Sequence, residues 1–119
     1  MIKEHNRYDV GDWLSKSVES WWANVFIGGN YNASEMACRD ICFPKGLCVT
    51  IEKTKYIFGG GSEDGVRVGL IQYPPFPETI ECLMQKAISV GKKIAEENKQ
   101  FSFTVVTPTE NIFFSRIKK

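Results

Sequence analysis

Hydrophobic and polar residues alternate along two neighbouring segments in the middle of the chain, residues 47–58 and 66–73. A repeat of two is typical of a β-strand that buries one face. The intervening residues 59–65 read GGGSEDG, and glycine adopts the positive φ angles that tight turns need. The pattern therefore predicts a β-hairpin with a mobile tip over residues 59–65.

Apolar residues recur every three or four positions over residues 78–99, which predicts an amphipathic helix. Three prolines, Pro74, Pro75 and Pro77, come before it. Because proline lacks a backbone N–H group, these residues form an extended connector and not an interior strand.

A second helix is predicted from Asn32 to Phe43. Asn32 lies three residues before Glu35, which is the spacing of a capping box. Gly46 is suited to a left-handed cap at the other end of this helix. The spacing of apolar residues predicts a third, shorter helix over residues 9–22.

Two further segments favour β-strands. Residues 24–27, NVFI, favour a short strand that stops at two glycines. Residues 101–117 alternate in polarity, with a break at residues 107–111. This last segment is either a terminal hairpin or one strand that bends onto the edge of the sheet.

The resulting order is strand, helix, strand, strand, helix, strand, which is the split βαβ pattern of ferredoxin-like α+β domains. The sequence thus predicts an antiparallel sheet with both helices on one face, preceded by an extra N-terminal helix. We expect a single domain over residues 1–119, with a loose arm at residues 1–8 and the α+β core at residues 24–117.

The overall charge is nearly balanced, with fifteen basic and fourteen acidic residues among 119 and a formal net charge of +1. This balance argues against a protein that binds duplex nucleic acid, which would carry a basic surplus. No apolar run approaches the length that spans a bilayer, and the first residues lack the apolar stretch of a secretory signal. We therefore expect a cytoplasmic protein with no membrane partner.

The chain has four cysteines and one histidine, His5, which limits the metal-binding and nucleophilic chemistry that its side chains can perform. No CxxC pair occurs, so we expect buried free thiols, no metal site and no cofactor. A Ser-His-Asp or Cys-His set would need His5, which lies in the predicted arm. The sequence therefore favours a protein that is not an enzyme.

The strongest candidate binding site is the junction between the strand at residues 24–27 and the following helix. Backbone N–H groups at a helix N-terminus, together with the helix dipole, favour an anion. An ordinary turn is the alternative, since the dinucleotide-binding and P-loop spacings are both absent. The predicted ligand-binding residues are Gly28, Gly29, Asn30, Tyr31, Asn32 and Ser34, with Gly60 in a flap and Arg67 or Arg116 supplying charge.

Three tryptophans, Trp13, Trp21 and Trp22, fall within ten residues. They either close one end of the hydrophobic core or form an aromatic anchor for a partner protein, because tryptophan concentrates binding energy at interfaces. The sequence leaves both interpretations open.

Several short runs carry a resemblance to a known group of proteins: GLCVT at residues 46–50, YIFGG at residues 56–60 and GVRVGLIQYPPFP at residues 65–77. With Gly28-Gly29 and VVTP at residues 105–108 in register, they resemble small accessory proteins of tailed bacteriophages over residues 24–115. The resemblance implies a domain that a phage uses against its host, by binding a host protein or by sequestering a nucleotide signal. It implies no functional residues.

These observations lead to three hypotheses. The first is a non-enzymatic counter-defence protein, forming a homodimer in the host cytoplasm, that captures a small anionic ligand such as a nucleotide. The second is an inhibitor or adaptor that binds a host protein through the tryptophan-rich segment. The third is a small enzyme that processes a nucleotide.

Overall fold

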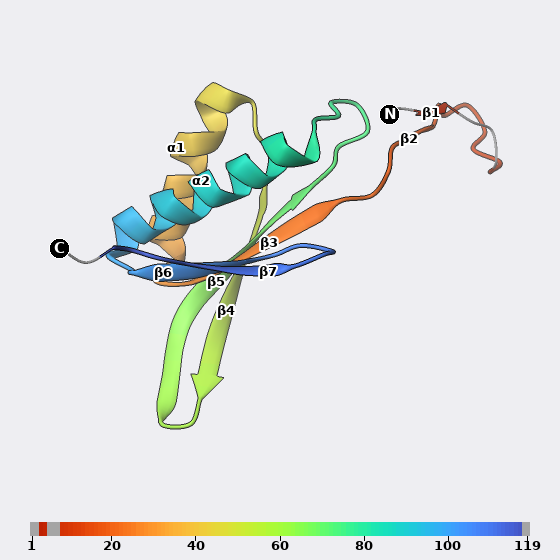
Figure 1. Ribbon diagram of the computed structural model, residues 1–119. Coiled ribbons are helices and arrows are strands. Elements are labelled where there is room, and N and C mark those ends of the chain that lie inside the picture. Colours follow the sequence, from red (N-terminus) through yellow and green to blue (C-terminus); the bar gives the residue numbers. More distant parts are fainter. Residues whose placement is uncertain (1–2, 5–7, 118–119) are drawn as a thin grey trace.

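The computed structural model of the chain describes residues 3–4 and 8–117. Two helices cover one face of a five-stranded antiparallel sheet with strand order β4-β5-β3-β6-β7 (Figure 1). The α+β class and its ferredoxin-like order are confirmed, and β7 adds a fifth strand at the edge. The elements of this core are β3 (Trp22–Gly28), α1 (Tyr31–Lys45), β4 (Thr50–Phe58), β5 (Gly61–Ile71), α2 (Ile80–Asn98), β6 (Ser102–Val106) and β7 (Asn111–Ser115).

The core lies between the helices and the three inner strands of the sheet, β5, β3 and β6. Alternate residues of β3 and β5 face the helices and are almost completely buried, because a strand turns every second side chain to the same face. Helix α2 packs its apolar stripe against them, and Gly91 lets the ring of Phe103 approach its backbone. The buried side chains of these three elements include Val25, Ile27, Val66, Val68, Leu70, Leu83, Val90 and Ile94.

Helix α1 begins two residues earlier than the capping-box spacing predicts. Asn30, and not Asn32, is the N-cap: its backbone is extended and its side-chain oxygen accepts a hydrogen bond from the N–H of Ala33 at 2.9 Å. Gly46 ends the helix with a φ of 60°, so the predicted left-handed cap is confirmed.

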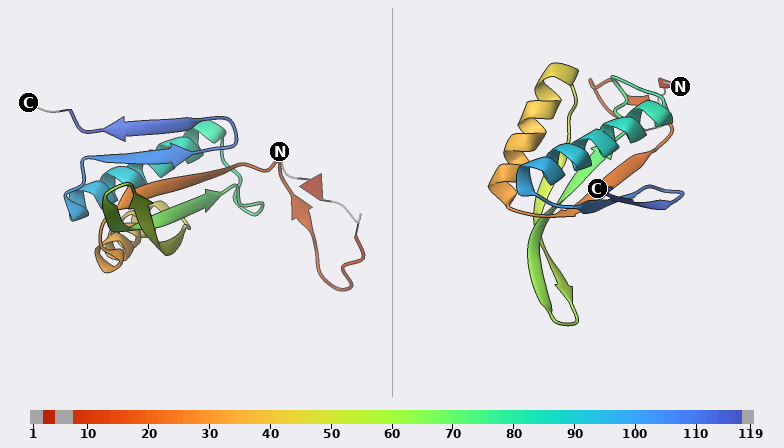
Figure 2. Two further views of the ribbon diagram at one scale, coloured as in Figure 1. Left: turned by 90° about the horizontal axis from the view of Figure 1, so that it is seen from below. Right: turned by 60° about the vertical axis from the view of Figure 1, so that its left-hand side comes forward.

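The glycine-rich segment after β4 is mostly strand and not a loop. Only Gly59 and Gly60 form the turn, and residues 61–65 pair with residues 54–58. The prediction of a mobile tip over residues 59–65 is therefore wrong, because the cross-strand ladder continues through the glycines. The resulting hairpin extends well beyond the rest of the sheet (Figures 1 and 2).

The predicted N-terminal helix over residues 9–22 is wrong. Gly11 adopts a φ of 61°, and β2 (Lys16–Ser17) pairs with β1 (Lys3–Glu4) in a small separate sheet beyond the start of β3 (Figure 2). The segment has no buried face that could stabilise a helix, since Trp13 and Leu14 are 77% and 94% exposed. Most of the predicted arm, residues 1–2 and 5–7, lies outside the described residues.

The C-terminal segment is a hairpin formed by β6 and β7, which settles the alternative that the sequence left open. Thr107 stabilises its turn, because the Thr107 hydroxyl accepts a hydrogen bond from the N–H of Glu110 at 3.1 Å. Across the described residues, neither helix combines the length and the apolar character needed to cross a bilayer.

Candidate functional site

A hollow of about 240 Å³ lies beside the end of β3, where the β4–β5 hairpin leaves the sheet. Gly28 and Gly65 form the last residue pair between β3 and β5, and beyond it the hairpin strands pair only with each other. The lining residues are Phe26, Ile27, Gly28, Tyr56, Glu63, Gln100, Ser102, Phe103, Thr104 and Phe113.

Two glycines allow polar side chains to lie directly on the sheet in this hollow. A Cβ atom at Gly28 would lie 2.5 Å from a carboxylate oxygen of Glu63, and one at Gly65 would lie 2.4 Å from the ring of Tyr56. Tyr56 and Glu63 are themselves cross-strand partners, so their side chains are neighbours on one face. The glycines therefore hold a phenol and a carboxylate side by side.

Tyr56 is fixed in this position and remains protonated at neutral pH. Its hydroxyl donates a hydrogen bond of 2.7 Å to the carbonyl oxygen of Val66. Burial, and to a lesser extent the nearby Glu63 carboxylate, raise the pKa of Tyr56 above its usual value, because both disfavour a phenolate. Tyr56 thus contributes an aromatic ring and a neutral hydroxyl group.

Glu63 has no ion-pair partner among the described residues, unlike Glu35 and Glu78, which also line hollows. Its one recorded side-chain donor is the neutral amide of Gln100, at 3.3 Å. By contrast, Glu35 is paired with Arg39 at 2.7 Å and Glu78 with Lys86 at 2.5 Å. An uncompensated carboxylate among aromatic rings favours a ligand with a positive charge.

The predicted anion site at the start of α1 is largely occupied by the protein's own acceptors. The N–H of Gly29 donates to the carbonyl of Asp64, and that of Asn30 to the side-chain oxygen of Asn98, both at 2.9 Å. Ser34 is fully buried and donates to the carbonyl of Asn30 at 2.7 Å. These contacts join the end of β3 to both helices.

The remaining residues predicted to bind a ligand are dispersed. Tyr31 lines a separate hollow, Asn32 is exposed on α1, and Gly60 lies in the hairpin turn. Arg67 is paired with Glu52 on the sheet face opposite the helices. Of the predicted set, Gly28 is the member that lines the hollow described here, and a role in binding stays a prediction for the others.

Arg116 lines a neighbouring hollow of about 380 Å³ at the C-terminal end of α2. Lys92 and Glu96 share that hollow, so its charges compensate each other more than those around Glu63. Gln100 and Phe103 line both hollows and separate them.

The tryptophans have different environments. Trp21 is 8% exposed and belongs to the core, whereas Trp13 is exposed and Trp22 is half-buried at the start of β3. The structure therefore supports the core interpretation for Trp21. A partner-binding role stays a prediction for Trp13 and Trp22.

All four cysteines are free thiols. Cys38 is buried, as expected, but Cys42 is half-buried, and Cys48 and Cys82 are exposed. The expectation of buried thiols is therefore wrong for these three. Burial, with a smaller contribution from Cys42, raises the pKa of Cys38 to about 11, which leaves it protonated. Over the described part of the chain, no three His, Cys, Asp or Glu side chains converge in a way that could hold a metal ion.

Comparisons with known proteins find similarity in structure and not in sequence. No protein-family profile matches the chain. No curated protein matches it either. Two solved structures share its fold. A phage SAM lyase in the apo state aligns with a TM-score of 0.69 and 16% identity, over 83% of this chain and 91% of that chain. A phage SAM lyase in complex with S-methyl-5'-thioadenosine aligns with a TM-score of 0.57 and 19% identity, over 81% of this chain and 89% of that chain.

At these identities the likeness shows the fold alone, and both similar proteins come from phages, as the resemblance of the sequence implied. Both are also enzymes, so our expectation that the chain is not an enzyme is contradicted. That expectation depended on the absence of a nucleophile and base set. A lyase that breaks a bond within one substrate does not require such a set.

Proposed function

We propose that this protein is a small lyase that binds S-adenosylmethionine, or a closely related sulfonium nucleoside, in the hollow around Glu63. The observation that carries the proposal is the uncompensated Glu63 carboxylate beside Tyr56, in a fold shared with a phage SAM lyase. The proposal corresponds to the nucleotide-processing enzyme of the sequence hypotheses, and its ligand carries a positive charge where we had expected an anion.

The chemistry of the hollow fits a sulfonium cation. A carboxylate attracts the positive sulfur, and the faces of aromatic rings stabilise cations within about 6 Å. Three phenylalanines, Phe26, Phe103 and Phe113, line the hollow together with Tyr56. Aromatic and apolar walls also suit the flat adenine ring, which stacks on such side chains.

We take the molecule bound to the similar lyase, S-methyl-5'-thioadenosine, as the product of the proposed reaction, and it indicates which bond would break. This product keeps the methyl group, the sulfur and the adenosine, so the bond between sulfur and the amino-acid side chain is the one that breaks. The bonding pair stays on sulfur, which becomes a neutral thioether. Because a lyase adds no water, the electron pair that replaces sulfur comes from the amino-acid fragment itself. An oxygen of its α-carboxylate attacks the carbon, a C–O bond forms as the C–S bond breaks, and the fragment leaves as a cyclic ester with no proton to remove.

Glu63 has a defined role in this proposal. Its negative charge binds the sulfonium and holds the bond between sulfur and the departing carbon in line with the attacking carboxylate oxygen of the substrate. Tyr56 has its hydroxyl engaged by the Val66 carbonyl, so its contribution is the ring that lines the cation site. No step requires a general base with a tuned pKa.

Binding measurements with matched ligands test this assignment. S-adenosylhomocysteine has the same nucleoside and amino acid as S-adenosylmethionine but lacks the sulfonium charge. We expect isothermal titration calorimetry to show tighter binding of the sulfonium compound to the wild type and equal binding of both compounds to E63Q. Equal affinities in the wild type would contradict the role of Glu63.

We further propose that the protein acts inside a host cell, where consuming this methyl donor would weaken methylation-dependent defence. The phage resemblance implied that the protein sequesters a small molecule. The present proposal is that the protein instead destroys one. Expression of the wild type in a bacterial host should lower the S-adenosylmethionine pool, measured by mass spectrometry, whereas E63Q should leave it unchanged. An equal pool in both strains would contradict it.

Self-association also stays part of the proposal. The sheet face opposite the helices exposes Phe58, Ile71 and Phe113, and apolar side chains on an uncovered face favour contact with another molecule. Analytical ultracentrifugation should give a mass above that of the 13.5 kDa monomer. A monomer at micromolar concentration would exclude the homodimer expected from the sequence.

A further inference from the structure

We infer that Gln100 is a positioning residue for the Glu63 carboxylate. The inference rests on the proposed function, since it concerns how the carboxylate of that site is held. Gln100 belongs to the connection between α2 and β6, and Glu63 belongs to the distal part of the β4–β5 hairpin. The two residues lie 37 positions apart, and the amide nitrogen of Gln100 lies 3.3 Å from a carboxylate oxygen of Glu63.

The backbone at Gln100 is fixed by the end of helix α2. Lys99 adopts a φ of 57°, which is rare for a residue other than glycine, and the N–H of Gln100 donates to the carbonyl of Ala95 at 2.9 Å. Just before it, the side chain of Asn98 donates to the buried Ser34 hydroxyl at 3.1 Å. Gln100 therefore extends from a rigid corner of the fold.

Glu63 lies where the hairpin has lost its support from β3. The Gly28–Gly65 pair is the last between β3 and β5, and Glu63 comes two residues further out. The main chain there pairs with β4, and one further backbone bond, from the N–H of Gly29 to the Asp64 carbonyl at 2.9 Å, joins it to the rest of the fold. The hydrogen bond from the Gln100 amide fixes the carboxylate itself.

The geometry of this contact leaves the site open for a cation. Gln100 donates to one oxygen of Glu63 and brings no charge, so the carboxylate keeps its full negative charge and the other oxygen stays available. A lysine or arginine in the same place would orient the carboxylate equally well but would neutralise it. A neutral donor thus combines orientation with an uncompensated charge.

Kinetics of Q100A and Q100E test the inference. Loss of orientation should lower kcat about tenfold in Q100A with little change in KM, because a misplaced Glu63 still attracts the cation but no longer aligns it for cleavage. Q100E should lose more activity, because it places a like charge against Glu63. The matched control is Q85A, since Gln85 is an exposed glutamine on α2, far along the helix from the site.

A double variant separates orientation from charge. E63Q/Q100E exchanges donor and acceptor, so the contact can form again while the carboxylate moves to the other side of it. We expect its melting temperature to match that of the wild type and its kcat to stay as low as that of E63Q. Wild-type kcat and KM in Q100A would overturn the inference, as would a loss in Q100A that follows entirely from unfolding.

Failure of the proposed function gives a different result. If the wild type neither binds S-methyl-5'-thioadenosine nor cleaves S-adenosylmethionine, the proposed function fails and kinetics no longer apply. The ¹³C resonance of the Glu63 carboxyl then decides, because it reports the contact without substrate. A shift in Q100A and none in Q85A supports positioning by Gln100, and an unchanged resonance in Q100A overturns it.

Discussion

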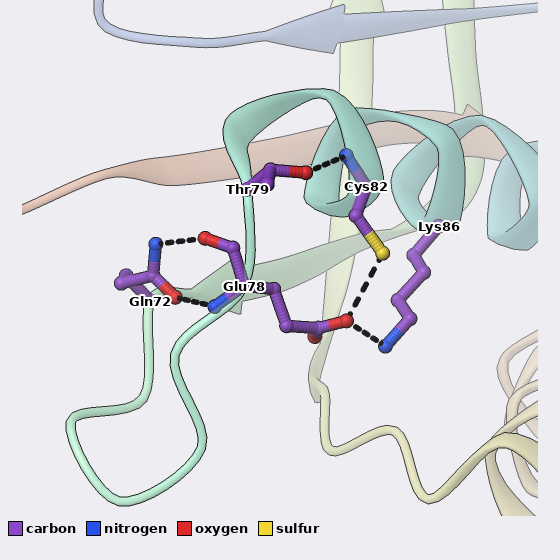
Figure 3. A network of polar contacts seen from close by, with 5 residues as sticks. All are labelled: Gln72, Glu78, Thr79, Cys82 and Lys86. Carbon is purple, nitrogen blue, oxygen red and sulfur yellow. Dashed lines mark hydrogen bonds and ion pairs between the residues drawn. The ribbon is translucent and has the colours of Figure 1, made fainter. Parts of the chain in front are cut away.

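Two carboxylates, Glu63 and Glu78, show how the same side chain can be committed to structure or left available for a ligand. Glu78 lies at the start of α2 and is surrounded by polar partners (Figure 3). Its carboxylate accepts from the Lys86 ammonium at 2.5 Å and from the Cys82 thiol at 3.1 Å. Its backbone N–H and carbonyl both bond to the side chain of Gln72, each at 2.8 Å.

The Glu78 contacts close the loop between β5 and α2 and consume the charge of the carboxylate. Lys86, and secondarily Cys82, hold the pKa of Glu78 below its usual value, because both donate to the ionised form. The same contact raises the pKa of Cys82. Glu63 instead has a neutral donor and a glycine beneath it. A charge that the fold does not compensate is the better candidate for function.

Replacement of Glu63 should have the largest effect on activity. We expect E63Q to lower kcat for S-adenosylmethionine cleavage by about a hundredfold, because the sulfonium is then no longer held in line for cleavage. Its melting temperature should stay close to that of the wild type, since Glu63 is exposed and has no ion-pair partner among the described residues. The matched control is E78Q, which should keep wild-type kcat. A full loss in E78Q and none in E63Q would reverse the comparison.

Gly28→Ala should displace the Glu63 carboxylate without unfolding the protein. The added Cβ would meet the end of a flexible side chain and not the backbone, so Glu63 must move. We expect kcat to fall about tenfold with a small change in stability. Gly59→Ala is the control, because a Cβ at that glycine has open space around it. Equal activity in both variants would show that the position of Glu63 is unimportant.

Replacement of Lys86 by methionine should affect stability and not activity. Because folding lowers the pKa of Glu78, its ionised form stabilises the fold at neutral pH, and that contribution is lost as the pH falls through the lowered pKa. We expect a loss of about 1 kcal/mol in the free energy of unfolding at pH 7. Urea titrations at pH 7 and pH 3 should show a smaller difference at the lower pH. A constant difference would contradict the ion-pair explanation.

The pair between Glu35 and Arg39 on α1 should have the smallest effect. The two side chains are separated by one helical turn, and Arg39 is 70% exposed to solvent. Arg39→Gln should therefore cost about 0.3–0.5 kcal/mol, and the cost should decrease in high salt. A loss comparable to that of Lys86→Met would show that exposure does not distinguish these two pairs.

Periodicity in the sequence predicted the fold well, because burial of one face imposes a repeat of two or 3.6 residues. The stripe of α2 and the alternation in β5 are direct examples. The prediction of a helix over residues 9–22 was wrong, because the spacing of apolar residues does not reveal whether that face has anything to pack against. Asn32 was predicted as the N-cap in place of Asn30, since asparagine can cap a helix at either position.

The candidate site was harder to predict, because it depends on contacts between residues far apart in the chain. Treating Gly59 and Gly60 as a two-residue turn would have paired Tyr56 with Glu63, and this signal was present in the sequence. No local pattern shows that Gln100 reaches Glu63 or that Lys86 neutralises Glu78. Only the folded structure shows which charged side chains have an ion-pair partner.

Direct observation of the reaction tests the central claim most simply. The purified protein is incubated with S-adenosylmethionine, and S-methyl-5'-thioadenosine is quantified by liquid chromatography and mass spectrometry against a protein-free sample and E63Q. The account predicts product formation in the wild type well above both controls. A rate equal to that of the protein-free sample would contradict it.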